Sequence, residues 1–291
     1  MDLSVIILSY NTKDITDECL FRLQSSVISA QKLLKNKIEV IVIDNASSDG
    51  SVEMIEKKHP WVNLIASREN TGFSRGNNLG LKKAKYPYVL FLNSDSFVED
   101  DTLEKALNYF KENPDVSVLG PKLVFADGSF QPSAGNLPTP LNTIYWILGI
   151  SLLPGFREML NPFHPNYKYF FKEAGEVGWI SGAFFMVKKD VLKKVGTFDE
   201  TYFMYFEEVE LCKRIVNGGF KIHYNPEIKV IHLHGASIGY GSTEPLIREL
   251  KGLRYYFNKY YKSAYLLMKM FLILGLILRT VVFSLLGKTK K

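Results

Sequence analysis

Apolar runs alternate with amphipathic stretches along the first third of the chain. The runs are continuous, which is typical of strands buried on both faces of a sheet. They occupy residues 3–8, 38–44, 62–67 and 88–93. Apolar residues at roughly helical spacing fill the intervals and predict helices at residues 14–34, 50–59 and 75–84. This alternation predicts an α/β fold with a mostly parallel central sheet and helices on both faces.

Each of the four predicted strands ends in a cluster of polar residues. In chain order the clusters are SYNT, DNASSDG, RENTGFSRGNN and NSDS. Turn chemistry explains any one of them, since Asn, Asp, Ser and Gly all favour turns. Ligands of open α/β sheets, however, bind beyond the carboxyl ends of the strands. The four clusters together therefore predict one pocket, with Asp95 at the tip of the fourth strand.

The rest of the chain is less regular. A predicted helix at 100–112 and a strand at 116–120 precede residues 136–172, which are rich in proline and aromatic residues. We interpret 136–172 as an insertion that lies on a membrane or over an acceptor site. Mixed α/β patterning returns at 175–233, and a basic, apolar tail closes the chain at 246–291.

Composition and charge narrow the class of protein. The 291 residues are 46% hydrophobic and 23% charged, as is ordinary for a globular protein. The formal charge of +6 permits anionic partners, namely nucleic acid, an acidic membrane or a phosphorylated substrate. No interleaved basic and aromatic patch supports nucleic acid, so we expect no nucleic-acid partner. Cys19 and Cys212 are too few and too distant in sequence for a disulfide framework, which fits a reducing compartment.

A glycine-rich stretch follows the third predicted strand. Its glycines are Gly72, Gly76 and Gly80. This spacing is not the dinucleotide-binding fingerprint, and no phosphate-binding P-loop occurs in the chain. Arg75, Asn77 and Asn78 nevertheless lie at a helix start, where backbone N–H groups and a guanidinium suit a diphosphate. The alternative is a capped helix with a solvated arginine.

Three glutamates stand in the aromatic stretch YFMYFEEVELCKR, residues 202–214. On a helix, Glu207 and Glu210 share a face and Glu208 points elsewhere. Carboxylates beside aromatic side chains gain proton affinity, which favours a general base. The alternative is a helix start whose acids complement the helix dipole.

Two histidines, His232 and His234, follow another predicted strand. In strand geometry, residues two apart point to the same side. A lone histidine is usually structural, but two beside a glycine and a serine are harder to dismiss. Asp95 with one of these histidines makes an oxygen-and-nitrogen site for Mg²⁺ or Mn²⁺.

In these stretches the chain resembles the family-2 glycosyltransferases, specifically their rhamnosyltransferase-like branch. The likeness rests on SVIILSYNT, VIVIDNASSDGS, ENTGFSRGNNLG with LFLNSDS, GWISGAFFMVKKDVLKKVGTFDETYFMYFEEVELCKR, and VIHLHGAS. The resemblance implies an A-type glycosyltransferase fold, in which a nucleotide-binding sheet is fused to an acceptor-binding half. It also implies inverting transfer from a nucleotide-diphosphate sugar with a divalent metal, Mg²⁺ or Mn²⁺.

The resemblance assigns roles to particular residues. Asp95 falls at the family's metal-binding acid, and His232 at a histidine that often completes metal or diphosphate binding. Asp44 matches the acid that contacts the nucleobase or ribose. Glu208 stands where the family usually has an aspartate as the base, which leaves open whether Glu207 or Glu208 acts. The donor-binding residues so implied are Ser9, Tyr10, Asn11, Asp44, Asn70, Gly72, Arg75, Asn77, Asn93, Ser94, Trp179 and Gly182.

These assignments predict a domain plan and partners. Residues 1–245 form the catalytic domain, with a nucleotide-sugar-binding half at 1–120 and an acceptor-binding half at 121–245. The branch favours rhamnose as the sugar and cell-surface polysaccharide synthesis as the process. We expect a lipid-linked, polyprenyl-diphosphate acceptor or an oligosaccharide, and a cytoplasmic enzyme bound at the inner face of the cell membrane. The alternative is a non-catalytic nucleotide-sugar-binding partner subunit, which the retained acids and histidine argue against.

The tail at 246–291 predicts contact with a membrane surface. Residues 263–286 are long enough to span a bilayer. Lys269 and Arg279 interrupt the run, however, and lie about 80° apart around a helix axis. Further basic residues in this sector are Lys251, Arg254, Lys259 and Lys262. The opposite side carries Leu267, Phe271, Leu274, Leu278 and Leu285. A helix so divided prefers to lie in the interface; a tilted span and a core or dimer helix are the alternatives.

Overall fold

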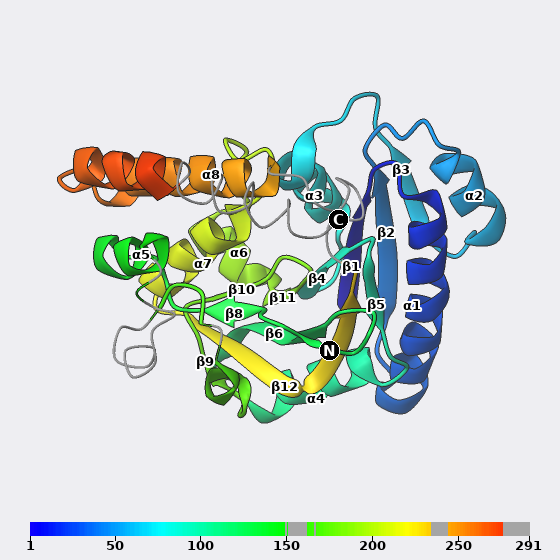
Figure 1. Ribbon diagram of the computed structural model, residues 1–291. Coiled ribbons are helices and arrows are strands. Elements are labelled where there is room, and N and C mark those ends of the chain that lie inside the picture. Colours follow the sequence, from blue (N-terminus) through cyan, green and yellow to red (C-terminus); the bar gives the residue numbers. More distant parts are fainter. Residues whose placement is uncertain (149, 151–161, 166, 234–243, 276–291) are drawn as a thin grey trace.

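The computed structural model describes residues 1–148, 150, 162–165, 167–233 and 244–275, and its elements form three layers around one mixed sheet (Figure 1). The strand order is β3-β2-β1-β4-β11-β6-β12-β5. The first four strands in this order are parallel, as the sequence predicts. They are β1 (Leu3–Ser9), β2 (Ile38–Asp44), β3 (Asn63–Ala66) and β4 (Tyr88–Asn93).

An antiparallel strand, β11 (Phe184–Lys188), joins this parallel group to the rest of the sheet. It pairs with β4 on one side and with β6 (Val116–Val124) on the other. β12 (Lys221–His232) runs parallel to β6 and carries β5 (Ser96–Val98) at the sheet edge. The short strands are β7 (Phe130–Gln131), β8 (Ala134–Gly135), β9 (Gly175–Glu176) and β10 (Trp179–Ile180).

Helices cover both faces of the sheet. One face carries α1 (Lys13–Leu34), α2 (Ser51–Lys58) and α4 (Thr102–Glu112). The other carries α3 (Gly72–Lys83), α6 (Lys189–Val195) and α7 (Glu207–Asn217). Successive residues of β1 divide between these layers: Val5 and Ile7 belong to the first apolar cluster and Ile6 to the second. The continuous apolar runs of the sequence are therefore strands buried on both faces.

Two predicted bounds shift in the structure. The helix predicted from residue 75 begins at Gly72, and the strand predicted to end at residue 120 continues to Val124. The strand passes through Pro121, which has no N–H to donate to its neighbours. Pro121 lies beside an irregularity of β12 between Asn225 and Lys229, where regular pairing is interrupted.

The segment predicted to associate with a membrane begins as part of the folded domain. α8 (Glu244–Tyr260) buries Leu250, Leu253 and Phe257 in the same apolar cluster as α7. The predicted boundary at residue 245 therefore falls inside a packed helix. Helical residues 265–275 continue beyond α8 and pack beside α5 (Pro140–Ile147), as the orange-to-red and green ribbons of Figure 1 show.

No helix within the described ranges is both long enough and apolar enough to cross a membrane. Several predicted features lie outside those ranges. They are residues 151–161 of the insertion, His234 with the glycine and serine after it, and Leu278, Arg279 and Leu285 of the tail.

Candidate active site

Parallel pairing brings the predicted polar clusters to one edge of the sheet. Ser9 at the end of β1 is paired with Asp44 at the end of β2, and Leu8 is paired with Asn93 at the end of β4. Just after β3, the Ser67 backbone N–H donates to the Asp44 carbonyl oxygen at 2.8 Å. All four clusters therefore meet at the carboxyl ends of the parallel strands.

Asp44 offers a buried acceptor at this edge. Its side chain is almost fully buried, and Oδ2 accepts the Ser47 backbone N–H at 2.9 Å. Oδ1 is also buried but takes no hydrogen bond from any residue that the structure describes. A buried acceptor without a donor is costly, so Asp44 is suited to take a hydrogen bond from a ligand.

The loops after β1 and β2 are tied together. Asn11 adopts a left-handed conformation with φ 51°, donates its backbone N–H to Ser47 Oγ at 2.9 Å, and accepts the Ser48 backbone N–H at 2.8 Å. The Asn11 side chain is thus engaged in holding the loops. Tyr10 beside it is 38% exposed and presents its ring at the rim of the strand ends.

Hydroxyl groups connect the end of β1 with the segment after β4. Ser9 Oγ lies 2.9 Å from Thr16 Oγ1 in α1, and Thr12 Oγ1 lies 3.3 Å from Ser94 Oγ. The Asn93 backbone N–H donates to the Ala183 carbonyl oxygen at 3.1 Å. These bonds fix the backbone that carries Asp95.

Asn45, which sequence reasoning missed, organises the loop before α3. Its Nδ2 donates to Asn70 Oδ1 at 2.8 Å, and its Oδ1 accepts the Thr71 backbone N–H at 3.0 Å. Asn70 Oδ1 also accepts the Gly72 backbone N–H at 3.0 Å. We name residues 70–72 the donor loop. The position of Asn45 directly after the buried Asp44 was the available sequence signal.

The later glycines of α3 serve close packing. A Cβ on Gly76 would overlap the Leu8 side chain, and one on Gly80 would overlap Ile6. The two glycines therefore let the helix backbone approach β1 more closely than any other residue would allow.

The polar residues of α3 have different surroundings. The Arg75 side chain is 61% exposed, and its guanidinium lies 3.8 Å from Glu69. Asn77 is buried and donates to the Phe73 carbonyl oxygen of its own helix at 3.0 Å, while Asn78 donates to the Phe198 carbonyl oxygen at 2.9 Å. Arg75 also lines a surface cavity with Ser67 and Thr71, so its role as a donor contact stays a prediction.

A strained turn leads into α7. Tyr205 and Phe206 are both left-handed, with φ 73° and 80°, a conformation that costs a non-glycine residue about 1–3 kcal/mol. The Phe203 carbonyl oxygen accepts the Phe73 backbone N–H at 2.6 Å. Gly72 next to it has φ 78°, and a Cβ there would overlap Phe203. We name residues 203–206 the catalytic turn, because they precede the predicted base, and Phe73, to which the turn is bonded, directly follows the donor loop.

Glu207 and Glu208 open α7 immediately after this turn. Oε2 of each is buried and takes no hydrogen bond from the described part of the chain. Burial, with the nearby charge of Glu208, raises the pKa of Glu207 well above its ordinary value. Burial is also the main cause that raises the pKa of Glu208 to about 7, and Glu249 adds to it. A carboxyl that titrates near neutral pH is suited to act as a general base.

Glu210, unlike Glu207 and Glu208, is bonded to several cationic and hydroxyl side chains. It is fully buried and receives hydrogen bonds from Arg214 at 2.8 Å, Lys259 at 2.8 Å and Tyr260 at 2.6 Å. Burial works against its charge, but these partners outweigh burial and hold the pKa of Glu210 below its ordinary value. Glu207 and Glu210 are both buried while Glu208 is half-buried, as the helical spacing predicts.

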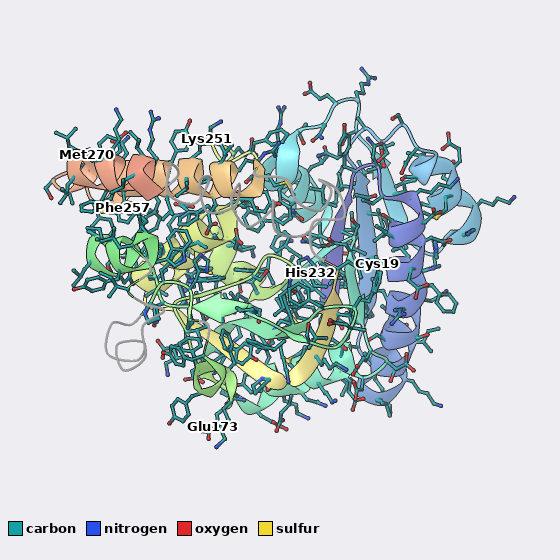
Figure 2. The ribbon with its side chains drawn as sticks, in the orientation of Figure 1. Cys19, Glu173, His232, Lys251, Phe257 and Met270 are labelled. Carbon is teal, nitrogen blue, oxygen red and sulfur yellow. The ribbon has the colours of Figure 1, made fainter. Side chains whose placement is uncertain are left out.

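Asp95 directly precedes β5, and His232, labelled in Figure 2, ends β12; the pairing of these two strands brings the two residues together. His232 Nε2 lies 3.3 Å from Asp95 Oδ1, and His232 Nδ1 lies 3.0 Å from Gln131 Oε1. Since Gln131 Oε1 can only accept, Nδ1 carries the proton. In a neutral ring, Nε2 then faces the carboxylate as a second acceptor, and a shared cation stabilises two such facing acceptors.

The chemistry of this pair fits a divalent ion. Neighbouring ligands of an octahedral ion with bonds of about 2.1 Å lie about 3.0 Å apart, close to the observed separation. No group of three or more potential ligand side chains occurs in the described ranges. Asp95 and His232 can therefore supply two ligands, and phosphate oxygens and water are the usual source of the others for Mg²⁺.

The two remaining residues predicted to bind the donor, Gly182 and Trp179, have different neighbours. Gly182 is beside Glu207 and Glu208, since a Cβ on it would lie 3.8 Å from Glu208 Cβ. Trp179 is buried, and its indole N–H donates to the Phe163 carbonyl oxygen at 3.1 Å. The only polar atom of the Trp179 side chain is thus already paired.

His164 and Glu249 form a second polar pair that sequence reasoning missed. His164 Nε2 lies 2.8 Å from Glu249 Oε1, and the His164 ring lies 5.2 Å from the rings of both Trp146 and Trp179. Both residues act electrostatically on Glu208. They are 85 positions apart in sequence, so a histidine within the aromatic insertion was the only signal.

Comparison with known sequences places these features in a family. The pattern of "Glycosyl transferase family 2" matches residues 4–196, well over half of the chain. N-acetylglucosaminyl-diphospho-decaprenol L-rhamnosyltransferase of Mycobacterium tuberculosis is 28% identical over 236 residues, which cover 75% of this chain and 73% of that protein. Low-salt glycan biosynthesis hexosyltransferase Agl10 of Haloferax volcanii is 25% identical over 79% of this chain and 67% of its own.

Solved structures share the fold. The mannosyltransferase PcManGT from Pyrobaculum calidifontis, in complex with GDP-Man and Mn²⁺, aligns with a TM-score of 0.63 at 17% identity, over 99% of this chain and 75% of that one. S. aureus TarS 1–349 in complex with UDP aligns with a TM-score of 0.56 at 20% identity, over 87% and 64%. The fold is the A-type glycosyltransferase fold, and a protein with this fold and these motifs is a glycosyltransferase enzyme. The chain belongs to glycosyl transferase family 2.

Proposed function

We propose that the chain transfers a sugar from a nucleotide-diphosphate donor to a hydroxyl of a lipid-linked glycan, with inversion at the anomeric carbon. One observation carries the proposal. Two glutamates, each with a buried Oε2 that takes no hydrogen bond from the described residues, open α7, and the catalytic turn before them is bonded to Phe73, directly after the donor loop. The proposed proton acceptor in α7 and the proposed binding site of the nucleotide-sugar donor are therefore held together by this bond.

Glu208 is the base in this proposal. It is half-buried, whereas Glu207 is almost fully buried, so Glu208 is the more accessible to an acceptor. The acceptor hydroxyl loses its proton to Glu208 while its oxygen bonds to the anomeric carbon. The bond from that carbon to the diphosphate breaks, and its electron pair leaves with the nucleoside diphosphate. A single displacement needs no enzyme nucleophile and inverts the configuration.

Asp95 and His232 would hold the Mg²⁺ or Mn²⁺ ion. When bound, such an ion neutralises charge on the departing diphosphate. Asp44 serves the other end of the donor, where its unpartnered Oδ1 can accept a hydrogen bond from a ribose hydroxyl or a base N–H. Tyr10 at the rim can pack against the base.

Rhamnose is the proposed sugar, and a polyprenyl-diphosphate-linked glycan is the proposed acceptor. Support comes from the relative in Mycobacterium tuberculosis, whose name specifies an N-acetylglucosaminyl-diphospho-decaprenol acceptor and L-rhamnose. Such acceptors are held in a membrane, so we propose that the enzyme works at the cytoplasmic face of the cell membrane, in cell-surface polysaccharide synthesis. The rival interpretation is a non-catalytic nucleotide-sugar-binding subunit, whose function would not require a buried carboxylate oxygen without a hydrogen bond on each of Glu207 and Glu208.

The test is a transfer assay on the purified chain. Nucleotide-sugars are screened by thermal shift with Mn²⁺ or Mg²⁺, and those that bind are assayed with a short-chain prenyl-diphosphate N-acetylglucosamine acceptor. Glu208→Gln should bind the donor normally and transfer ~10²–10⁴-fold more slowly. Glu53→Gln is the matched control, an exposed acid in the first turn of α2. Full activity of Glu208→Gln with a dead Glu207→Gln would move the base by one residue, and donor binding without transfer to any acceptor would favour the rival.

A further inference from the structure

The outer face of helical residues 265–275 is apolar and exposed. Its side chains are between 42% and 71% exposed, and they are Leu266, Leu267, Met270, Ile273 and Leu274. We name these five residues the apolar stripe. On the opposite face Met268 and Leu272 are buried, and a Cβ on Gly275 would touch Ile147 of α5. One side of the helix anchors it to the protein, and the other leaves large apolar groups uncovered.

The stripe is contiguous. At 100° per residue, its five side chains fall within about 120° of the helix circumference, opposite the buried face. Single exposed apolar residues are normal on a protein surface, but contiguous patches mark contact sites. The sequence pattern predicted an apolar side that includes Leu267, Phe271 and Leu274. The structure instead centres the exposed face on Met270, because Phe271 is half-buried against the core.

α8 supplies a basic section beside the stripe. Lys251 and Arg254 of α8 are exposed, as is Lys262 in the turn that follows it. Figure 2 shows Lys251 and Met270 on the upper side of these two helices and Phe257 on the side toward the core. We name Lys251, Arg254 and Lys262 the basic section.

The positive charge of the chain resides in this region. Residues 250–291 contain nine Lys and Arg residues and no Asp or Glu, so the other residues carry a net charge of −3 within the total of +6. A surface that is apolar and basic complements an anionic bilayer, where apolar side chains enter the acyl boundary and lysines reach the headgroups. A second copy of the chain would present the same positive charge and be repelled.

We propose that the apolar stripe and the basic section dock the enzyme on an anionic lipid bilayer, with the stripe inserted and the basic section on the headgroups. This inference rests on the proposed function, because a lipid-linked acceptor is held in such a bilayer. α8 also connects the surface with the chemistry. Its Glu249 lies 2.8 Å from His164, and both act electrostatically on Glu208, so docking through α8 brings the proposed base toward the lipid headgroups.

The test is flotation of the full chain with vesicles of phosphatidylcholine containing phosphatidylglycerol. The triple variant Leu266→Gln, Met270→Gln, Ile273→Gln should bind roughly 100-fold more weakly, because three inserted apolar side chains are lost. The matched control is Phe21→Gln, Ile28→Gln, Leu33→Gln, whose native residues on α1 are 57% to 64% exposed. The control should float like the wild type, and equal flotation of the stripe variant would overturn the proposal.

Two further experiments test the contribution of the basic section and the alternative that a second copy of the chain occupies the stripe. Changing Lys251, Arg254 and Lys262 to Gln should weaken binding about five-fold per charge on anionic vesicles and leave neutral vesicles unaffected. Sedimentation identifies the rival: a stripe variant that turns a dimer into a monomer without losing flotation shows an interface between copies, and the proposal is then wrong.

The failure of docking and the failure of the proposed function give different results. With a soluble, short-chain acceptor, the stripe variant should transfer sugar at the wild-type rate, since no stripe residue belongs to the catalytic site. If the wild type transfers to this acceptor but never floats, docking fails and the transferase stands. If the wild type floats but transfers sugar to no acceptor, docking stands and the proposed transferase function fails.

Discussion

Glu208, the proposed base, shows at the residue scale how burial raises the pKa of a carboxyl group. Its pKa of about 7 implies that kcat rises with pH through neutrality as the carboxylate forms. Because the Glu249 charge contributes to raising that pKa, Glu249→Gln should shift the rise to lower pH. Glu173→Gln, an exposed acid at the lower edge of Figure 2, is the control. Profiles of kcat against pH measure the shift, and an unmoved profile in Glu249→Gln contradicts the proposed coupling.

The Glu208 carboxylate should lower the free energy of unfolding at high pH. The folded state raises the pKa of Glu208 from 4.5 to about 7, so it binds the proton more tightly than the unfolded chain does. The stabilising contribution is complete below pH 4.5 and is lost as the pH rises through about 7. Glu208→Gln should therefore be more stable than the wild type at pH 8, by on the order of 1–3 kcal/mol, and equal to it near pH 4. Thermal unfolding at both values tests this, and a variant less stable at pH 8 refutes it.

Asp95 and His232 make a metal prediction at this scale. Asp95→Asn keeps the size of the side chain but removes the charge that a divalent ion needs. Titration calorimetry with a nucleoside diphosphate should show that Mn²⁺ no longer strengthens binding. Asp101→Asn is the control, because Asp101 is about half exposed and pairs with Lys105 instead. A metal response of Asp95→Asn equal to that of the wild type removes Asp95 from the site.

At the scale of elements, the contact between the donor loop and the catalytic turn depends on Gly72. Gly72→Ala suffers both a left-handed φ of 78° and an overlap with the Phe203 backbone. Gly128→Ala has nearly the same φ, 80°, with nothing within 4 Å of its Cβ, so it isolates the backbone cost of about 1 kcal/mol. Gly72→Ala should unfold at a clearly lower temperature than Gly128→Ala and lose most transfer activity. Calorimetry and initial rates measure both, and identical behaviour of the two variants rules out the steric coupling.

The sequence predicted the elements better than the contacts between them. Continuous apolar runs identify β1 to β4, and the polar ends of these strands meet because parallel strands share an edge. The left-handed Tyr205 and Phe206 were beyond reach, since neither is a residue type that signals this conformation. The pairing of His164 with Glu249 depends on packing of distant segments, which no local pattern records.

At the scale of the whole molecule, the chain separates its charges. The carboxyl ends of the parallel strands lie in a part of the sequence with a small negative net charge, while residues 250–291 carry the net positive charge. The formal charge of +6 first suggested affinity for any anionic partner. Its location fits the proposed docking on an anionic bilayer, and the proposed recognition of the donor then depends on individual groups such as Asp44 and the Asp95–His232 pair.

This separation predicts that salt affects the two kinds of acceptor differently. Ions screen charges at the bilayer surface with a Debye length of about 10 Å at 0.1 M and about 3 Å at 1 M, whereas buried groups are screened much less. Transfer to an acceptor embedded in anionic vesicles should therefore fall several-fold between about 0.05 and 0.5 M salt. Transfer to a soluble short-chain acceptor should change little, because its chemistry depends on the buried Glu208. The variant without Lys251, Arg254 and Lys262 should be slow and nearly salt-independent on vesicles. Equal salt dependence with both acceptors would mean that screening acts at the catalytic site, and not at the docking surface.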